Sequence, residues 1–414
     1  MGLLNQKTNL GVPFYSRGLL GVFVWVPLLV APAFAEGDLF ELSLESLSQI
    51  KVASGFKESE QYVGSSVSTI TEQEWRAQGA EKTFDAIEHF PGIYLSEHFH
   101  GMVVPSFRGQ TSPTQYNSFL VLLDGMPLNN YSSASATYGT PNFALGNLER
   151  IEVIRGPGSA LYGADAFNGV VSLNSWSSDK DIIEINSEVG QYGYGKVDAR
   201  ARYSLSDDIA VTSILSYQTV DDLEIEDNFH PAPGAPQVNS EISGGYENIT
   251  TTQKLAIHNV NLAFYYSEHE VDDSFGSGES GGFPNGQHTD GLAKMKALSL
   301  SYELPLAESW SLESHVFYSE DELFGSFGLA NVGGPPTSPT FDWDSKDNRL
   351  GLGLVAKKPL GSQQQQLIFG YNYDKMEVEH LAVGVEGSMP SVESQDREFN
   401  GFMGQLDQRL FDGA

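Results

Sequence analysis

The sequence predicts a small α+β domain followed by an antiparallel transmembrane β-barrel, of which the chain holds about ten strands. Three observations predict this fold class. Apolar and polar residues alternate in segment after segment beyond residue 180, as they do in strands with two different faces. The connections between these segments alternate between short and long. Before residue 180, short strand patterns mix with helical patterns and glycine-rich turns.

The first 35 residues have the organisation of a secretory signal peptide. Lys7 and Arg17 make the start positive, an apolar run covers 19–30, and Ala35 closes an Ala-x-Ala cleavage signal. A transmembrane anchor is the alternative, but the apolar run contains a proline and is shorter than the roughly 20 residues that a spanning helix needs. We therefore predict a signal peptide at 1–35 and an exported mature chain.

Composition narrows the class of protein. The formal net charge of −31, from 23 basic and 54 acidic residues, disfavours nucleic acid as a partner. The chain has no cysteine, which excludes a disulfide-stapled secreted scaffold. The sequence has no His-Glu-x-x-His motif and no cysteine nucleophile, so we expect no enzyme. We also expect no resident metal or other cofactor.

The small domain is expected between about residues 50 and 175, and its clearest element is a helix. In the capping box Thr71 to Glu74, Thr71 accepts from the first-turn amides and Glu74 reaches back, and Gly79 ends the helix. A second helix is expected over 83–89. Strands are expected at 67–70, 119–123, 151–155 and 170–173, with a tight turn at Asp124-Gly125.

The second part of the chain is predicted to consist of strands near 181–190, 194–205, 208–219, 250–257, 259–268, 291–304, 308–319, 347–357, 363–375 and 398–411. After a short first link, the even-numbered links are tight turns, whereas the later odd-numbered links are long and polar. Short turns on one side and long loops outside the cell are typical of outer-membrane barrels. A soluble β-sandwich is the alternative, but it has no reason to segregate its connections in this way.

Several ordered motifs of the small domain resemble the plug domain of TonB-dependent receptors. They are Phe107-Arg108-Gly109, the runs at 120–125 and 148–157, Leu161-Tyr162-Gly163-Ala164 and the run at 168–171. The family usually has two glycines where Asn168-Gly169 stands, and an Ile-Asn-Ile strand where Val171-Ser172-Leu173 stands, which are mild departures. The resemblance covers about 50–175 closely and the rest only through its strand pattern.

The resemblance implies a protein of the bacterial outer membrane in which the small domain fills the barrel as a plug. The expected layout is a signal peptide at 1–35, a leader at 36–57, the plug domain at 58–176 and a partial transmembrane β-barrel at 177–414. The leader is too short for the extra signalling domain of transducing receptors. Transport without direct transcriptional signalling is therefore favoured.

The resemblance also implies polar contacts between plug and barrel. Arg108 and Arg155 would be buried inside the barrel, where an arginine needs a partner. In the family, plug arginines of this kind pair with barrel glutamates, so these two residues are the predicted plug–barrel lock. The alternative is that they bond local carbonyl groups.

A short segment of the leader looks like the TonB box of the family. It consists of Ile50, Lys51, Val52, Ala53 and Ser54. In the family this extended segment adds as a strand to the energising protein. The alternative is an ordinary first strand of the plug.

Two plug loops, before and after the Phe107 motif, are the candidates for ligand contact. Phe99 and Tyr116 could stack on a planar chelate. His98 and His100 lie two residues apart and could bind haem or a metal complex. Exposed loop histidines are more often unliganded, so both interpretations stay open.

The function that the resemblance implies is active uptake of a scarce ligand, such as a ferric siderophore, cobalamin or haem, across the outer membrane. Its expected partners are TonB with the inner-membrane energising complex, outer-membrane lipid, and the small-molecule ligand, with metal chelates among the candidates. One alternative is a binding-only surface receptor or adhesin, which needs no TonB box. Another is an exported hydrolase, which the lack of a cysteine nucleophile and of a His-Glu-x-x-His motif disfavours.

These 414 residues are expected to be a fragment. Lipid offers no partner for an open strand edge, so a membrane barrel must close. A barrel wide enough to hold a plug needs roughly 22 strands, which puts the whole chain near roughly 700 residues. A closed ten-stranded barrel is the alternative, and its first and last strands would pair with each other.

Overall fold

The computed structural model describes residues within the second of two compact units of the chain, Leu42–Ala414. The described residues are 49–50, 58–59, 66–97, 103–107, 109, 119–132, 136, 143–156, 166–221, 225–229, 238–242, 245–271, 291–328, 340–360, 365–385 and 391–408. None of the helices in this part of the chain is long and apolar enough to cross a membrane.

A five-stranded mixed sheet forms the small domain. Its strands follow the order β3-β8-β9-β6-β7, in which β6 and β9 run parallel and the other neighbours antiparallel. The four strands and the tight turn predicted from the sequence are confirmed. The bounds are β3 (Ser66–Thr71), β6 (Phe119–Leu123), β7 (Met126–Pro127), β8 (Leu148–Arg155) and β9 (Gly169–Ser175).

The first helix forms where the capping box predicts it. α2 (Glu72–Gln78) begins after Thr71, whose backbone N–H donates to Glu74 Oε2 at 2.8 Å. Gly79 ends the helix in the left-handed conformation, at φ 73°, where a Cβ atom would be strained. Trp75 is the buried side chain of this helix and packs into the core of the small domain.

The second helix predicted over 83–89 is wrong in type and in length. Only a short 3-10 turn, η2 (Asp85–Ile87), forms there. The Asp85 carboxylate accepts from the backbone N–H of Lys82 at 2.9 Å, and the Thr83 hydroxyl donates to the carbonyl of Phe143. These side-chain hydrogen bonds compete with the backbone hydrogen bonds of a longer helix.

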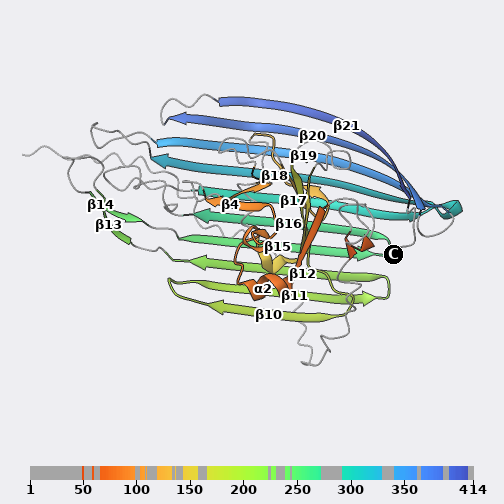
Figure 1. Ribbon diagram of the computed structural model, residues 1–414, viewed down its shortest axis with the longest axis horizontal. Coiled ribbons are helices and arrows are strands. Elements are labelled where there is room, and N and C mark those ends of the chain that lie inside the picture. The colour runs from red at the N-terminus through yellow and green to blue at the C-terminus, as the bar shows by residue number, and fades with distance from the viewer. Residues whose placement is uncertain are drawn as a thin grey trace, which may run out of the picture. The chain divides into compact units, whose positions relative to one another are not determined.

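A ten-stranded antiparallel sheet makes up the second part of the chain, and Figure 1 shows its strands side by side in chain order. All ten strands predicted from the alternation are confirmed. They are β10 (Ile182–Val189), β11 (Gly195–Ser206), β12 (Ile209–Val220), β15 (Tyr246–Ile257), β16 (Val260–Val271), β17 (Gly291–Pro305), β18 (Ser311–Gly328), β19 (Thr340–Pro359), β20 (Gln365–Val385) and β21 (Ser391–Gln408).

The ten-stranded sheet is open. Within the described residues, β10 has β11 as its neighbour and β21 has β20, and the two edge strands do not pair with each other. The expectation that the first and last strands stay unpaired is confirmed. The closed ten-stranded barrel is therefore wrong for these residues.

The later strands are longer than the sequence pattern predicts. The strand expected at 308–319 continues as β18 to Gly328, and the one expected at 347–357 already begins at Thr340. The seventh and ninth connections therefore shrink to 329–339 and 386–390. Charged residues on both faces of these strand ends hide the apolar period on which the prediction depended.

Three further strand pairs lie outside the predicted elements. Each is a short antiparallel ladder, and one of them lies within the third connection of the large sheet. The pairs are β1 (Gln49–Ile50) with β2 (Glu58–Ser59), β4 (Ile93–Glu97) with β5 (Val103–Phe107), and β13 (Ile225–Phe229) with β14 (Val238–Ile242).

The two faces of the large sheet have opposite character. On the outward face, Ile185 is 70% exposed and Leu298 is 49% exposed, although both are apolar. On the inward face, Arg200, Thr250 and Ser319 are buried against the rest of the protein. Apolar residues outside and polar residues inside are expected when lipid covers the outer face.

Candidate functional site

The candidate site is the seam along which the small domain contacts the inward face of the large sheet. Part of this contact is apolar, because Tyr265, Met295, Ala297 and Phe317 of the large sheet belong to the same buried cluster as the core of the small domain. Four groups of polar contacts between described residues cross the seam as well. They decide how firmly the small domain is held.

The first polar group joins α2 to β11. Arg200 Nη1 and Nη2 donate to the two carboxylate oxygens of Glu72 at 2.7 and 2.9 Å, and Arg200 Nε donates to the carbonyl of Gly146 at 2.7 Å. Arg200 is only 2% exposed. Burial raises the pKa of Glu72, but the bonds to Arg200 and Arg76 outweigh it, so that this pKa lies below its ordinary value.

Glu72 is well placed for this pairing by the local sequence. It follows Thr71 directly and therefore lies in the first turn of α2, where a carboxylate interacts favourably with the helix dipole. Arg76, one turn later, donates to Glu72 from its Nε atom at 2.8 Å. The carboxylate is thus held by one arginine from its own helix and one from the large sheet.

The second contact is a close backbone approach at η4 (Leu145–Asn147). A Cβ atom at Gly146 would lie 2.0 Å from Asp198 Oδ1 and 2.5 Å from Ser216 Oγ, so only glycine fits against this wall. Asn147 Nδ2 donates to Ser216 Oγ at 2.8 Å. The lack of a side chain at Gly146 and the hydrogen bond from the Asn147 amide together let η4 contact β11 and β12.

The third polar group surrounds Asp124, in the turn between β6 and β7. Its carboxylate accepts from the backbone N–H of Ser175 at 2.9 Å and from the Tyr265 hydroxyl at 2.8 Å, and lies 3.6 Å from Lys254 Nζ. Lys254 also donates to the carbonyl of Trp176 at 3.3 Å. Burial raises the pKa of Asp124, but Lys254 and the hydrogen bonds lower it below its ordinary value. This group fixes the end of β9, where the small domain passes into the large sheet.

A further polar contact joins the segment after β7 to β19. Asp347 accepts from the backbone N–H and the hydroxyl of Ser132, at 2.8 and 2.6 Å. Arg349 Nη1 donates to the carbonyl of Asn129 at 3.0 Å, and its Nε atom donates to Asp374 at 2.7 Å. The small domain is therefore held at widely separated strands of the large sheet.

A cavity of about 430 Å³ lies between the two sheets. Asp124, Gly125 and Pro127 line it from the small domain, and the inward faces of β16 to β21 line it from the large sheet. No group of three or more His, Asp or Glu side chains in the described part of the chain could hold a metal ion.

Few of the site residues predicted from the sequence fall within the described residues. Ile50 pairs with Glu58 in the β1–β2 ladder. The rest of the predicted TonB box, from Lys51 to Ser54, lies outside the described residues, as do Arg108, His98, Phe99, His100 and Tyr116.

Arg155 is among the described residues, and it donates hydrogen bonds to two residues of the small domain. Its Nη1 atom donates to the carbonyl of Pro91 at 2.7 Å, and its Nη2 atom donates to Ser68 Oγ at 2.8 Å. These are bonds of the kind that the alternative interpretation expected. Pairing of Arg155 with a barrel glutamate stays a prediction.

The sequence interpretation missed the Glu72–Arg200 pair. A signal was present in β11, where Lys196, Asp198, Arg200 and Arg202 recur at every second position. Charged residues with a period of two indicate a polar inward face that needs partners. The partner on α2 could not be chosen without the tertiary structure.

The comparison with known families agrees with this architecture. Residues 59–170 match the TonB-dependent receptor plug domain. The small domain is a plug domain of the kind found in TonB-dependent receptors. The large sheet resembles the barrel wall of these receptors, and the protein is an outer-membrane protein.

Two curated relatives carry the name vitamin B12 transporter BtuB. The one from Vibrio vulnificus strain YJ016 is 26% identical over 229 residues, which cover 55% of this chain and 33% of the relative. The one from strain CMCP6 is 31% identical over 135 residues, or 31% of this chain and 21% of the relative. The chain thus spans a third or less of the length of these curated relatives.

Solved structures show the same fold. The ferripyoverdine receptor of the outer membrane of Pseudomonas aeruginosa matches with a TM-score of 0.64 at 12% identity, covering 86% of this chain and 51% of that one. The ferric-catecholate import receptor Fiu from E. coli K12 matches with a TM-score of 0.57 at 14% identity, covering 80% and 51%. At these identities the likeness concerns the fold alone.

Proposed function

We propose that the full-length protein takes up a scarce ligand of the cobalamin or ferric siderophore class across the outer membrane, driven by TonB. The cobalamin class is the first to test, because the two curated relatives are named vitamin B12 transporters. Haem remains a third candidate. A plug domain of this family within the chain is the support for energised transport.

The observation that carries the proposal is the nature of the seam. A plug must seal the barrel at rest and yet move when the ligand passes. The polar contacts that hold it are few and specific, and the chief one is the Glu72–Arg200 pair. Contacts of this kind hold one geometry and can be exchanged for water, whereas a wholly apolar seam would not release.

The path of the pulling force supports the same proposal. β3 follows the leader in sequence and is an edge strand of the plug sheet, with β8 as its neighbour. We propose that TonB binds the box formed by Ile50, Lys51, Val52, Ala53 and Ser54 by strand addition. Tension on the box then reaches the β1–β2 ladder and after it β3.

The remaining assignments are part of the proposal. The mature protein would begin after a signal peptide at 1–35, with a leader at 36–57, a plug at 58–176 and barrel strands from 177 onward. The ligand would contact His98, Phe99, His100 and Tyr116 from outside the cell. Arg108 and Arg155 would help to lock the plug, and the inner-membrane energising complex would act through TonB.

The test measures binding and uptake separately for the full-length protein. Cells that express it are given labelled cyanocobalamin or labelled ferric siderophores, with TonB present or deleted. The proposal expects surface binding in both strains and accumulation only with TonB. Binding without TonB-dependent accumulation for every ligand would instead favour a binding-only surface receptor.

A further inference from the structure

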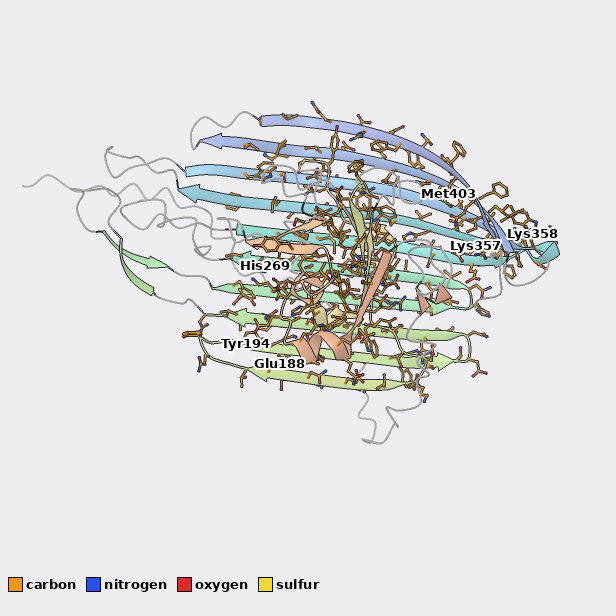
Figure 2. All side chains as sticks on the ribbon, in the orientation of Figure 1. Glu188, Tyr194, His269, Lys357, Lys358 and Met403 are labelled. Carbon is orange, nitrogen blue, oxygen red and sulfur yellow. The ribbon has the colours of Figure 1, made fainter. Side chains whose placement is uncertain are left out.

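The cavity between the plug and the large sheet lies on the side of the short connections. Glu303, near the end of β17, and Glu313, near the start of β18, both line it, and the chain between these strands is the short turn 306–310. Figure 2 shows Met403, which also lines the cavity, toward the same end of the sheet as Lys357. Short turns of an outer-membrane barrel face the periplasm. The cavity therefore lies toward the periplasm.

Two glycines make room for the cavity in the wall of the large sheet. Gly353 of β19 and Gly370 of β20 both line it. A Cβ atom at Gly353 would lie 4.0 Å from the carbonyl oxygen of His315, so the space in front of this glycine is open. Leu122 of the plug lines the cavity as well. The volume of about 430 Å³ lies within the range of small-molecule sites, roughly 300–1,000 Å³.

Carboxylates dominate the charge of the cavity, and none of the described residues that line it is a lysine or an arginine. The four carboxylates are those of Asp124, Glu303, Glu313 and Asp374. Basic residues outside the lining hold three of them by ion pairs, with Lys254, Lys357 and Arg349 as partners. Glu303 has no ion pair with another described residue, so its negative charge stays uncompensated.

Glu303 and Glu313 lie directly opposite each other on β17 and β18. Like charges in this position destabilise a sheet. Lys357 Nζ donates to Glu313 Oε1 at 2.6 Å, which compensates one of the two carboxylates. Strand pairing therefore gives no reason for a glutamate at position 303, whereas a positively polarised group bound in the cavity does.

The rest of the lining is partly polar and partly apolar. Asn261 of β16 and Asn372 of β20 line the cavity with side chains that can accept or donate hydrogen bonds. Phe317 and Met403 add apolar surface. A lining of this kind suits an organic group that carries N–H donors on an apolar frame.

We propose that the cavity is an exit-side subsite, in which the transported ligand is held by its amide or ammonium groups after it has passed the plug turn at Asp124. The N–H groups of the ligand donate to Glu303 and Glu313, and the apolar lining contacts the frame that carries them. A cavity of about 430 Å³ takes one edge of a corrin or chelate rather than the whole ligand. The exit-side role rests on the proposed function, whereas the preference for N–H donors over anions rests on the cavity alone.

The first test measures the charge preference of the cavity in the purified full-length protein. These 414 residues contain no cysteine, and any cysteine beyond them is first changed to serine. Gly353→Cys then places a single thiol in the cavity. The thiol is modified either with 2-aminoethyl methanethiosulfonate, which carries an ammonium group, or with 2-sulfonatoethyl methanethiosulfonate, which carries a sulfonate. The matched control adds Glu303→Gln to Gly353→Cys.

We expect the ammonium reagent to react roughly tenfold or more faster than the sulfonate reagent, after division by their rates with free cysteine, because an acidic lining concentrates cations. Glu303→Gln should lower this preference severalfold, because it removes the uncompensated charge. A preference no larger than that of free cysteine would overturn the proposal, and so would one that Glu303→Gln leaves unchanged.

The second test asks whether the ligand passes through the subsite. Cells that express the Gly353→Cys variant or a Lys180→Cys control are treated with the aminoethyl reagent. They are then given labelled cyanocobalamin or labelled ferric siderophores. The tethered ammonium group occupies the cavity in the first variant, whereas Lys180 is an exposed residue before β10 and does not line the cavity.

We expect the treated Gly353→Cys cells to lose most of their accumulation while surface binding stays unchanged, and the Lys180→Cys cells to lose none. A reductant that removes the tether should restore accumulation, which separates an occupied subsite from a misfolded variant. Accumulation that the treatment leaves unchanged would overturn the subsite and leave the proposed function intact. No accumulation even by wild-type cells would overturn the proposed function, whereas the first test decides the donor preference of the cavity separately.

Discussion

Arg200 of the barrel wall holds Glu72 of the plug by two parallel hydrogen bonds, at 2.7 and 2.9 Å. The polarity of this contact is the reverse of the one expected for the plug lock, because the arginine comes from the wall and the carboxylate from the plug. The pair lies one residue beyond the end of β3. It therefore holds α2 at the point where the first strand of the plug ends.

The first prediction concerns the strength of this pair. Glu72→Gln leaves the buried Arg200 with its longer ion pair to Glu184, at 3.8 Å. Removing one member of a fully buried ion pair costs about 3–5 kcal/mol. Glu72 is partly exposed, so we expect a smaller loss of about 1–3 kcal/mol in the local stability of α2. Hydrogen exchange of the α2 amides measures it. Glu88→Gln, an exposed change in the same domain, serves as the control, and equal protection in the two variants would contradict the prediction.

The second prediction is the pH dependence of the same contact. The pKa of Glu72 is lowered in the folded state from an ordinary value of 4.5. A lowered pKa means that the stabilisation is fully present above about pH 4.5 and is lost as the pH falls through the folded value. Protection of the α2 amides should therefore fall in acid in the wild type and fall less in Glu72→Gln. The idea fails if both proteins lose protection over the same pH range by the same amount.

The third prediction uses the close approach at Gly146. Gly146→Ala places a methyl group about where Asp198 Oδ1 lies, so η4 must move and the bond from Arg200 Nε to its carbonyl must lengthen. Overpacking of this kind costs roughly 1–3 kcal/mol. Gly195→Ala is the matched control, because its Cβ atom would lie 3.5 Å from the nearest side-chain atom, at Thr219. Thermal unfolding of both variants decides the matter, and equal midpoints would show that the wall leaves room at η4.

The fourth prediction concerns coupling to TonB. Val52→Pro removes a backbone amide from the proposed strand addition, so energised uptake should stop while ligand binding at the cell surface stays unchanged. Asp38→Pro, in the same leader but outside the box, should leave both intact. Normal uptake by the Val52→Pro variant would place the box elsewhere.

The fifth prediction concerns the plug as a seal. Deleting residues 36–175 from the full-length protein should leave a barrel that lets large solutes pass without energy. Influx of a large antibiotic into cells measures the leak, and cells that express the intact protein are the control. An unchanged influx would count against the assignment of this domain as the seal.

The strand pattern of this chain was predictable because each strand meets lipid on one side and polar surroundings on the other. Residues such as Leu298 and Leu300 alternate with Ser299 and Ser301, and this alternation predicts β17 without further information. The same reasoning stopped short in β18 and β19, where charged residues such as Glu320 and Lys346 lie on the outward face beyond the apolar belt. There both faces are polar, and the period disappears from the sequence.

The local elements of the plug divide in the same way. Thr71 and Glu74 cap the start of α2, and Gly79 ends it, so the signals for this helix lie within a few residues of each other. The segment expected as a second helix has a stop at Pro91-Gly92 but no capping box at its start. The hydroxyl of Thr83 donates to the carbonyl of Phe143, far away in the sequence. A contact between residues that lie so far apart in the sequence leaves no pattern in the neighbouring residues.

The sequence by itself determined the family resemblance, the ten wall strands, four strands of the plug and the capped helix, because these depend on motifs and on alternation within short segments of the chain. Only the tertiary structure decided that Glu72 meets Arg200, that Asp124 meets Tyr265 and Lys254, and that Gly146 lies against Asp198. The physical reason is that these contacts join the plug to the large sheet, between residues that lie far apart in the sequence. The packing of the plug against the wall determines which residues meet. In the sequence, these residues are recognisable only as charged residues and a glycine whose partners are not specified.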